Sequence, residues 1–179
     1  MAKSSSSRGR YYYAGGKKVE LIPADDLIAI DEQALESASL SEAVRAALRK
    51  AMRPLSGGVG LVDRAELKDD GAEVVQALQA ASATHPVFRS HGSVVVVLPE
   101  VRVEESRGAE QARIAEWLAS HATETVVKSR DEDRLVFEPK SGYGGDALDL
   151  ANKLTEQVGP EMAQARFLRI TPRPPTMRR

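Results

Sequence analysis

The three histidines, His85, His91 and His121, are the residues with the most obvious capacity for acid–base or metal chemistry. None of them belongs to an HxH or HExxH pattern, so no two imidazoles are placed as ligands on one helix face. Gly and Ser follow His91, but the GxSxG pattern of a serine hydrolase is absent. The histidines therefore predict neither a metal centre nor a catalytic triad. We expect a turn between strands at His91 and a helix end at His121.

A glycine-rich segment, Gly142-Tyr143-Gly144-Gly145-Asp146, precedes a strongly helical pattern. Backbone N–H groups at a helix N-terminus can bind an anion. Asp146 competes for this position, because its carboxylate can cap the same N–H groups. No GK[ST] sequence follows, and the segment therefore favours a helix capped by its own aspartate over a nucleotide site.

Other groups that could do chemistry are solvated or missing. Glu100 and Glu104 fall on one face of a predicted strand, and Glu105 lies at its end, which is typical of a solvated strand face. Acid–base catalysis instead needs partners in a cleft.

The chain has no cysteine, which excludes disulfides, zinc–thiolate and iron–sulfur sites and a thiol nucleophile. We therefore expect a protein that is not an enzyme and needs no cofactor.

Basic residues gather near both ends of a chain whose net charge is −1. They are interleaved with Tyr11, Tyr12 and Tyr13 at the start, where they could contact phosphates while the rings stack on bases. A net charge this close to zero provides no general attraction to nucleic acid. Nucleic-acid binding therefore stays a minor alternative to charged termini that keep the protein dissolved. The basic residues are Arg8, Arg10, Lys17 and Lys18, with Arg166, Arg169, Arg173, Arg178 and Arg179.

The serine-rich start has no apolar stretch typical of a signal peptide, and the longest apolar run, Val94–Leu98, is far too short to cross a bilayer. We expect a cytoplasmic protein with no membrane partner.

The second half of the chain predicts a β-α-β-β-α-β order over residues 93–171. A continuous apolar run, Val94–Leu98, is followed by alternating apolar and charged residues up to Glu105, which predicts a strand. After Gly108, apolar residues at helical spacing around Trp117 predict a helix. Two alternating segments flank the charged tip 129–133 and predict a hairpin, and a second helix and a last strand, 165–170, complete the unit. This order is that of a ferredoxin-like α+β sandwich with an antiparallel sheet.

The first half repeats this order less clearly. Strands are expected at 27–30 and 59–62, helices after Ser41 and Asp70, and a weak strand at Arg64–Leu67. The sequence thus predicts two tandem units. We divide the chain into a disordered basic, tyrosine-rich arm (1–18), an N-terminal α+β unit (19–91), a ferredoxin-like unit (92–171) and a Pro/Arg-rich tail (172–179).

Several segments resemble the prodomain-like region that precedes the catalytic domain of bacterial subtilisin-like (S8 family) serine proteases. They are residues 11–23, Pro86–Arg89, 97–104, Gly145–Leu154 and Met162–Arg169. In that family the helix tends to read Ala-Leu-x-x-Ala-Asn-x-Leu, and the following strand Ala-Glu-Pro-Asn-Phe. This chain has Gln164, Ala165 and Arg166 in place of Glu-Pro-Asn, and it lacks the catalytic domain.

The resemblance implies a ferredoxin-like unit that binds a separately encoded subtilisin-like protease as inhibitor, folding chaperone or adaptor. Family prodomains dock by the sheet face and thread their C-terminal segment into the substrate cleft. The alternative is a structural module whose ferredoxin-like units self-associate into a homo-oligomer with no protease partner. The residues expected to bind the partner are Phe167, Arg169, Thr171, Pro172, Arg173, Pro174 and Pro175.

Overall fold

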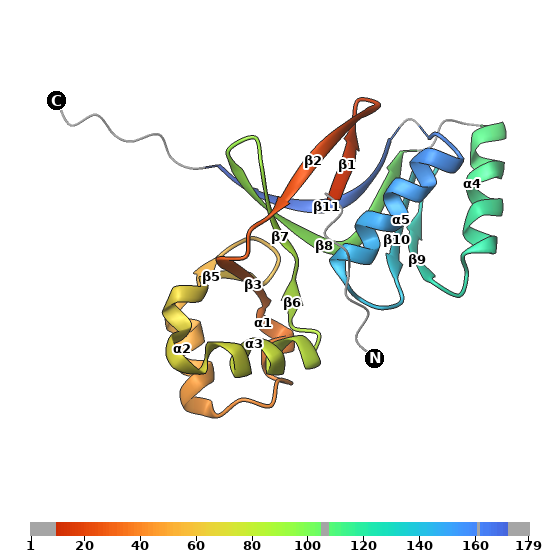
Figure 1. Cartoon of the computed structure of the whole chain (residues 1–179). Coiled ribbons are helices and arrows are strands. Elements are labelled where there is room, and N and C mark those ends of the chain that lie inside the picture. The colour runs from red at the N-terminus through yellow and green to blue at the C-terminus, as the bar shows by residue number, and fades with distance from the viewer. Residues whose placement is uncertain (1–9, 105–107, 161, 172–179) are drawn as a thin grey trace, which may run out of the picture.

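The computed structural model describes residues 10–104, 108–160 and 162–171, and shows two lobes joined side by side (Figure 1). Within these residues it is a mixed α+β structure with antiparallel sheets, five α-helices and eleven strands. The N-terminal lobe comprises residues 27–85 and the C-terminal lobe residues 93–170. The strand β7 (Val87–Ser90) and the hairpin of β1 (Arg10–Ala14) and β2 (Lys17–Pro23) complete the structure.

The C-terminal lobe has the element order that its sequence predicts. Its four strands lie in the order β9-β10-β8-β11, each antiparallel to its neighbour. Both helices cover the same face of this sheet (Figure 1). The elements are β8 (Ser93–Glu104), α4 (Ala109–Ser120), β9 (Thr125–Arg130), β10 (Arg134–Pro139), α5 (Gly144–Gln157) and β11 (Met162–Ile170).

The N-terminal lobe repeats this connectivity with shorter strands. Its sheet order is β4-β5-β3-β6, also antiparallel throughout. The elements are β3 (Leu27–Asp31), α1 (Glu32–Leu35), α2 (Glu42–Ala51), β4 (Arg53–Pro54), β5 (Val59–Asp63), a 3₁₀ helix (Arg64–Asp70), α3 (Gly71–Ala80) and β6 (Thr84–His85).

The weak strand expected at Arg64–Leu67 is wrong, because this segment lies in the 3₁₀ helix. The Asp63 carboxylate accepts a hydrogen bond from the Ala65 N–H (2.9 Å), and this local bond turns the chain at the end of β5. The missing strand is β4, whose two residues pair with Gly60 and Leu61 of β5.

The arm expected over residues 1–18 is wrong for residues 10–18, which form β1 and the start of β2. Gly15 and Gly16 have positive φ angles and make the tight turn between these strands. Tyr12 is 4% exposed and lies in the core of the C-terminal lobe. Of the three tyrosines only Tyr12, in the middle, is buried. One buried side chain among polar neighbours gives too weak an alternation to indicate a strand from the sequence.

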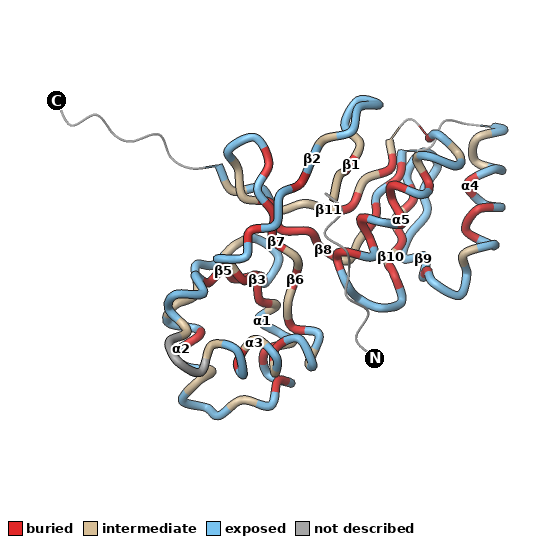
Figure 2. The backbone as a smooth tube through the Cα atoms, in the orientation of Figure 1, coloured by how far each residue is buried: buried red, intermediate tan, exposed pale blue. Residues whose placement is uncertain are grey.

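Three apolar cores hold the structure together (Figure 2). The first lies between the C-terminal sheet and its helices and includes Phe137 and Trp117, and the second lies beneath α2 and α3 of the N-terminal lobe. The third joins the lobes, since Ala29 and Leu61 of the N-terminal sheet pack with Val96 and other residues of the C-terminal sheet. Each lobe thus uses one sheet face for its own helices and the other for the joint.

Candidate functional site

The predicted partner-binding residues lie along the end of β11. Phe167 is half-buried and packs edge-on against Tyr12, with ring centroids 4.9 Å apart. The Arg169 guanidinium donates to the Tyr12 hydroxyl (2.7 Å), so both side chains hold the N-terminal hairpin. Thr171 is exposed. Pro172, Arg173, Pro174 and Pro175 lie outside the described residues.

The helix-free face of the C-terminal sheet is less open than the resemblance implies. Val94, Val96 and Leu98 of β8, with Leu168 and Ile170 of β11, belong to the joint between the lobes. The expectation that the sheet face docks on a partner is therefore wrong for the apolar end of that face, because the N-terminal sheet covers it.

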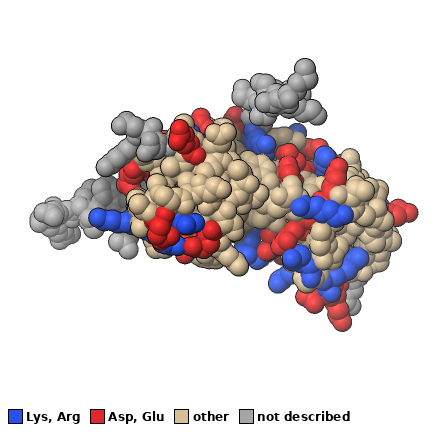
Figure 3. Space-filling model, turned by 90° about the horizontal axis from the view of Figure 1, so that it is seen from below, with Lys and Arg blue, Asp and Glu red and all other residues tan. Residues whose placement is uncertain are grey.

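Ion pairs cover part of the rest of this face. Glu100 of β8 pairs with Arg102 (2.7 Å) and with Arg166 of β11 (3.4 Å), and Lys128 pairs with Glu138 (3.3 Å) across β9 and β10. Acidic and basic side chains are also interspersed on the side seen from below (Figure 3). Exposed ion pairs of this kind contribute little to stability, but they show that Glu100 and Arg166 satisfy each other's charge.

The outer edge of β11 offers a different kind of surface. Among the described strands, β11 pairs only with β8, so its other edge carries backbone groups that another strand could join. The N-terminal hairpin touches β11 through Tyr12 rather than by strand pairing. One edge of β11 is thus without strand pairing, and an extended peptide could join it.

His91 and His121 occupy the structural positions that the sequence predicts. His91 has φ +48° in the turn between β7 and β8. His121 caps the end of α4 and stacks on Trp117 with ring centroids 4.0 Å apart. Trp117 also donates to the Gln157 side chain (2.7 Å). No group of three metal-ligating side chains occurs in the part of the chain that the structure describes.

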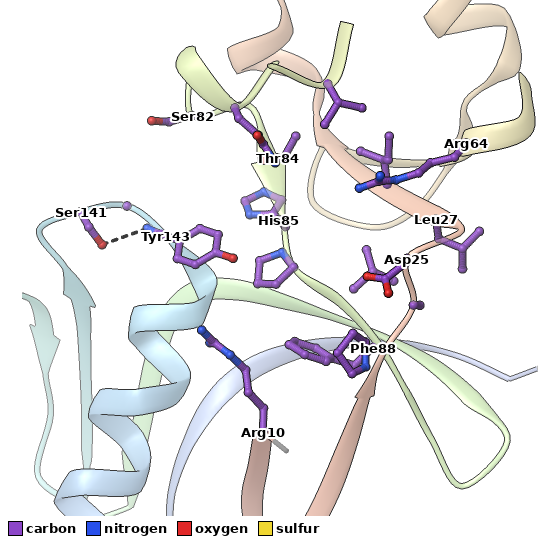
Figure 4. A pocket seen from close by; sticks show the side chains of 18 residues that line it. Arg10, Asp25, Leu27, Arg64, Ser82, Thr84, His85, Phe88, Ser141 and Tyr143 are labelled. Carbon is purple, nitrogen blue, oxygen red and sulfur yellow. Dashed lines mark hydrogen bonds between the residues drawn. The ribbon is translucent and has the colours of Figure 1, made fainter. Parts of the chain in front are cut away.

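A cavity of about 670 Å³ lies where the lobes meet the start of α5 (Figure 4). Its walls come from segments far apart in sequence: the start of β1, the chain entering β3, the turn before β6, β7 and the loop before α5. Polar residues that line it include Arg10, Asp25, Arg64, Gln79, Ser82, Thr84, His85 and Ser141. The size falls in the usual range for small-molecule sites, roughly 300–1,000 Å³.

His85 lies in the middle of this cavity (Figure 4). It is 8% exposed, and its Nδ1 atom has no hydrogen-bond partner. Its Nε2 atom is 3.8 Å from the Asp31 carboxylate. Burial lowers the pKa of His85, and the Asp31 charge opposes this shift only in part, so the site favours the neutral imidazole.

The start of α5 forms one end of the cavity, and Asp146 does not cap it as expected. Tyr143 takes the N-cap position without a side-chain capping bond. The Asp146 carboxylate instead accepts from the Ser141 hydroxyl (2.5 Å), because Asp146 lies inside the first turn rather than before it. A Cβ on Gly144 would collide with the Val97 carbonyl oxygen, which explains why glycine stands where α5 crosses β8.

Arg10 reaches into the same end of the cavity from β1 (Figure 4). Its Nη1 atom is buried without a hydrogen-bond partner and lies against Gly145. Desolvation raises the pKa of the nearby Asp149 carboxyl although the Arg10 charge lowers it. The sequence does not indicate this site, since Arg10 and His85 are 75 positions apart and only the Gly144-Gly145 pair marks it locally.

No helix among the described residues is long and apolar enough to cross a membrane. Comparisons with protein-family models, with curated proteins and with solved structures gave no significant match for this chain.

Proposed function

We propose that the chain is a protein-binding module that recognises a separately encoded subtilisin-like serine protease and acts by binding rather than by catalysis. Each lobe is, in this proposal, a ferredoxin-like unit. Both sheets support this proposal, because they share one strand order. If the strands of each lobe are numbered 1 to 4 along the chain, they lie in the order 4-1-3-2. The sequence resemblance to subtilase prodomain-like regions supplies the class of partner.

The observation that carries the proposal is the unpaired edge of β11. This strand leads directly into the exposed residue Thr171 and the Pro/Arg-rich segment after it. An extended segment can add main-chain hydrogen bonds to a protease cleft, and prolines reduce the entropy lost on binding. Because the apolar end of the sheet face is covered, we place the contact on the β11 edge and residues 171–179.

Binding to proteases should be measured with a panel of subtilisin-like enzymes whose active-site serine has been blocked, so that the chain is not consumed as a substrate. Inhibition and refolding are then measured with active enzyme. We expect the full chain to bind, and a chain that ends at Ile170 to bind at least tenfold more weakly. A chain with residues 171–179 in scrambled order is the matched control for length and charge.

Equal binding by the full and shortened chains would exclude the role of residues 171–179. Failure of the full chain to bind any protease of the panel would overturn the proposed function.

The alternative function is self-association through the opposite edge of the sheet. Val126 and Val127 of β9 are 43% and 49% exposed, and β9 is an edge strand. Two copies could pair along this edge. Light scattering during gel filtration over a wide range of concentrations tests this: a dimer that Val127→Lys abolishes would favour self-association, and a monomer at every concentration would exclude it.

A further inference from the structure

The cavity between the lobes contains polar groups that the folded chain does not satisfy by itself. Arg10 Nη1 and His85 Nδ1 are the buried side-chain nitrogen or oxygen atoms without a hydrogen-bond partner in the described part of the chain. Both residues line this one cavity. Leaving such an atom unpaired opposes folding, so two of them facing one space point to a ligand that supplies the missing partners.

The start of α5 is a third feature of the cavity that a ligand could satisfy, because it favours a negatively charged group. The 14-residue helix begins at this end of the cavity without a side-chain cap, and the positive end of its dipole favours negative charge. A guanidinium also binds oxyanions, often through two parallel hydrogen bonds. Arg10 and the helix start therefore favour an anionic group at this position.

The charge of the lining indicates how much negative charge the cavity can hold. Arg10 and Arg64 are the basic residues that line it, and Asp25 is the acidic one. The lining residues thus carry one excess positive charge when His85 is neutral, and the Asp31 and Asp149 carboxylates lie close behind His85 and Arg10. This favours a monoanion over a dianion. Apolar side chains make up much of the remaining wall: Leu27, Ile28, Val75, Val87 and Phe88.

We propose that this cavity binds a small organic monocarboxylate, with the carboxylate at the end formed by Arg10 and the start of α5, and the apolar body against the valine and phenylalanine side chains. Because Nε2 faces the Asp31 carboxylate, the neutral imidazole carries its proton on Nε2, and Nδ1 accepts a hydrogen bond from the ligand or from a water bound with it. No residue of β11 lines this site, and the inference does not rest on the proposed protease binding.

The test uses the full chain and NMR titration of its backbone amides with hexanoate and benzoate. Hexanamide and benzamide, which keep the apolar body without the charge, are the matched ligands, and inorganic phosphate tests for a general anion site. We expect saturable binding of the carboxylates, with shifts at His85 and at Gly144 and Gly145. Arg10→Gln should weaken this binding at least tenfold, the loss expected for a charge-assisted hydrogen bond.

Arg113→Gln removes an equally charged but exposed side chain of α4 and should bind like the unmodified chain. His85→Leu keeps Arg10 and tests the imidazole separately, and an unchanged amide spectrum outside the cavity shows that each variant is folded. Absence of saturable carboxylate binding, equal binding by the amides, or equal binding by folded Arg10→Gln would overturn the proposal. Tighter binding of phosphate than of both carboxylates would overturn the monocarboxylate assignment.

Discussion

The two lobes follow the same connectivity, yet they differ in how much sheet and core they contain. Strands β8 and β11 of the C-terminal lobe have twelve and nine residues, whereas β4 and β6 of the N-terminal lobe have two each. Eighteen buried residues form the main C-terminal core, against nine in the N-terminal one, counted over the described residues. The C-terminal core also takes in Tyr12 and Leu21 from the N-terminal hairpin.

This difference shows that strand order and strand length are set by different features. The order of strands in each sheet follows from the order of helices and hairpins along the chain. Strands of two residues, such as β4 and β6, are long enough to take their place in that order. Burial sets the stability, since apolar area removed from water is the main favourable contribution. We infer that the N-terminal lobe depends on the joint with the C-terminal lobe, while the C-terminal lobe depends on the hairpin.

The largest effect is expected when the hairpin is detached from the C-terminal core. Tyr12→Ala removes a buried ring that packs on Phe167 and accepts a hydrogen bond from Arg169. We expect a loss of about 3–5 kcal/mol in unfolding free energy, as for other buried aromatic residues, measured by urea denaturation. Tyr13→Phe, which removes one exposed hydroxyl bond to Glu156, is the control. A loss similar to that of the control would show that the lobe is stable without the hairpin.

The next largest effect compares one glycine in each lobe. Gly144→Ala forces α5 away from the backbone of β8, whereas the three atoms nearest to a Cβ on Gly60 all belong to the flexible Met52 side chain. We expect losses of about 3 kcal/mol and about 1 kcal/mol respectively, at the two ends of the range for overpacking. Thermal unfolding measures both, and the reverse ranking would contradict the close approach of α5 to β8.

A mutation in the joint tests whether the lobes unfold together. Leu61 is 5% exposed and packs with residues of both lobes. Leu61→Ala should cost about 2–3 kcal/mol, at the lower end for a buried leucine. Hydrogen exchange should then accelerate in β3 and in β8 alike. Acceleration confined to the N-terminal lobe would mean that the C-terminal lobe is stable by itself.

The smallest effect is a dependence on pH. Burial lowers the pKa of His85, so the unfolded chain takes up a proton more readily than the folded one. Stability should therefore fall as the pH drops below about 6.5, the pKa of an unperturbed histidine, and level off below the pKa of His85 in the folded protein. His85→Leu should flatten this dependence in urea denaturation, and His91→Asn, in an exposed turn, should preserve it.

The sequence predicts much of the C-terminal lobe because its signals are local. The alternation of Val101 and Val103 and the spacing of Leu148, Ala151 and Leu154 are sufficient to place a strand and a helix. The hairpin was not predicted, because burial of Tyr12 depends on Phe167 far along the chain. The cavity was not predicted for the same reason: Arg10, His85 and α5 come together only through the joint of the lobes.

The stacking of Trp117 on His121 provides an optical probe of one lobe alone. Trp117 is the single tryptophan of the chain, and residues 27–85 contain no tryptophan, tyrosine or phenylalanine. Fluorescence emission thus follows the surroundings of α4 and is silent for the N-terminal lobe, whereas circular dichroism of the backbone sees both. Superimposable unfolding curves from the two signals would mean one cooperative unit, and separated curves would give the order in which the lobes melt.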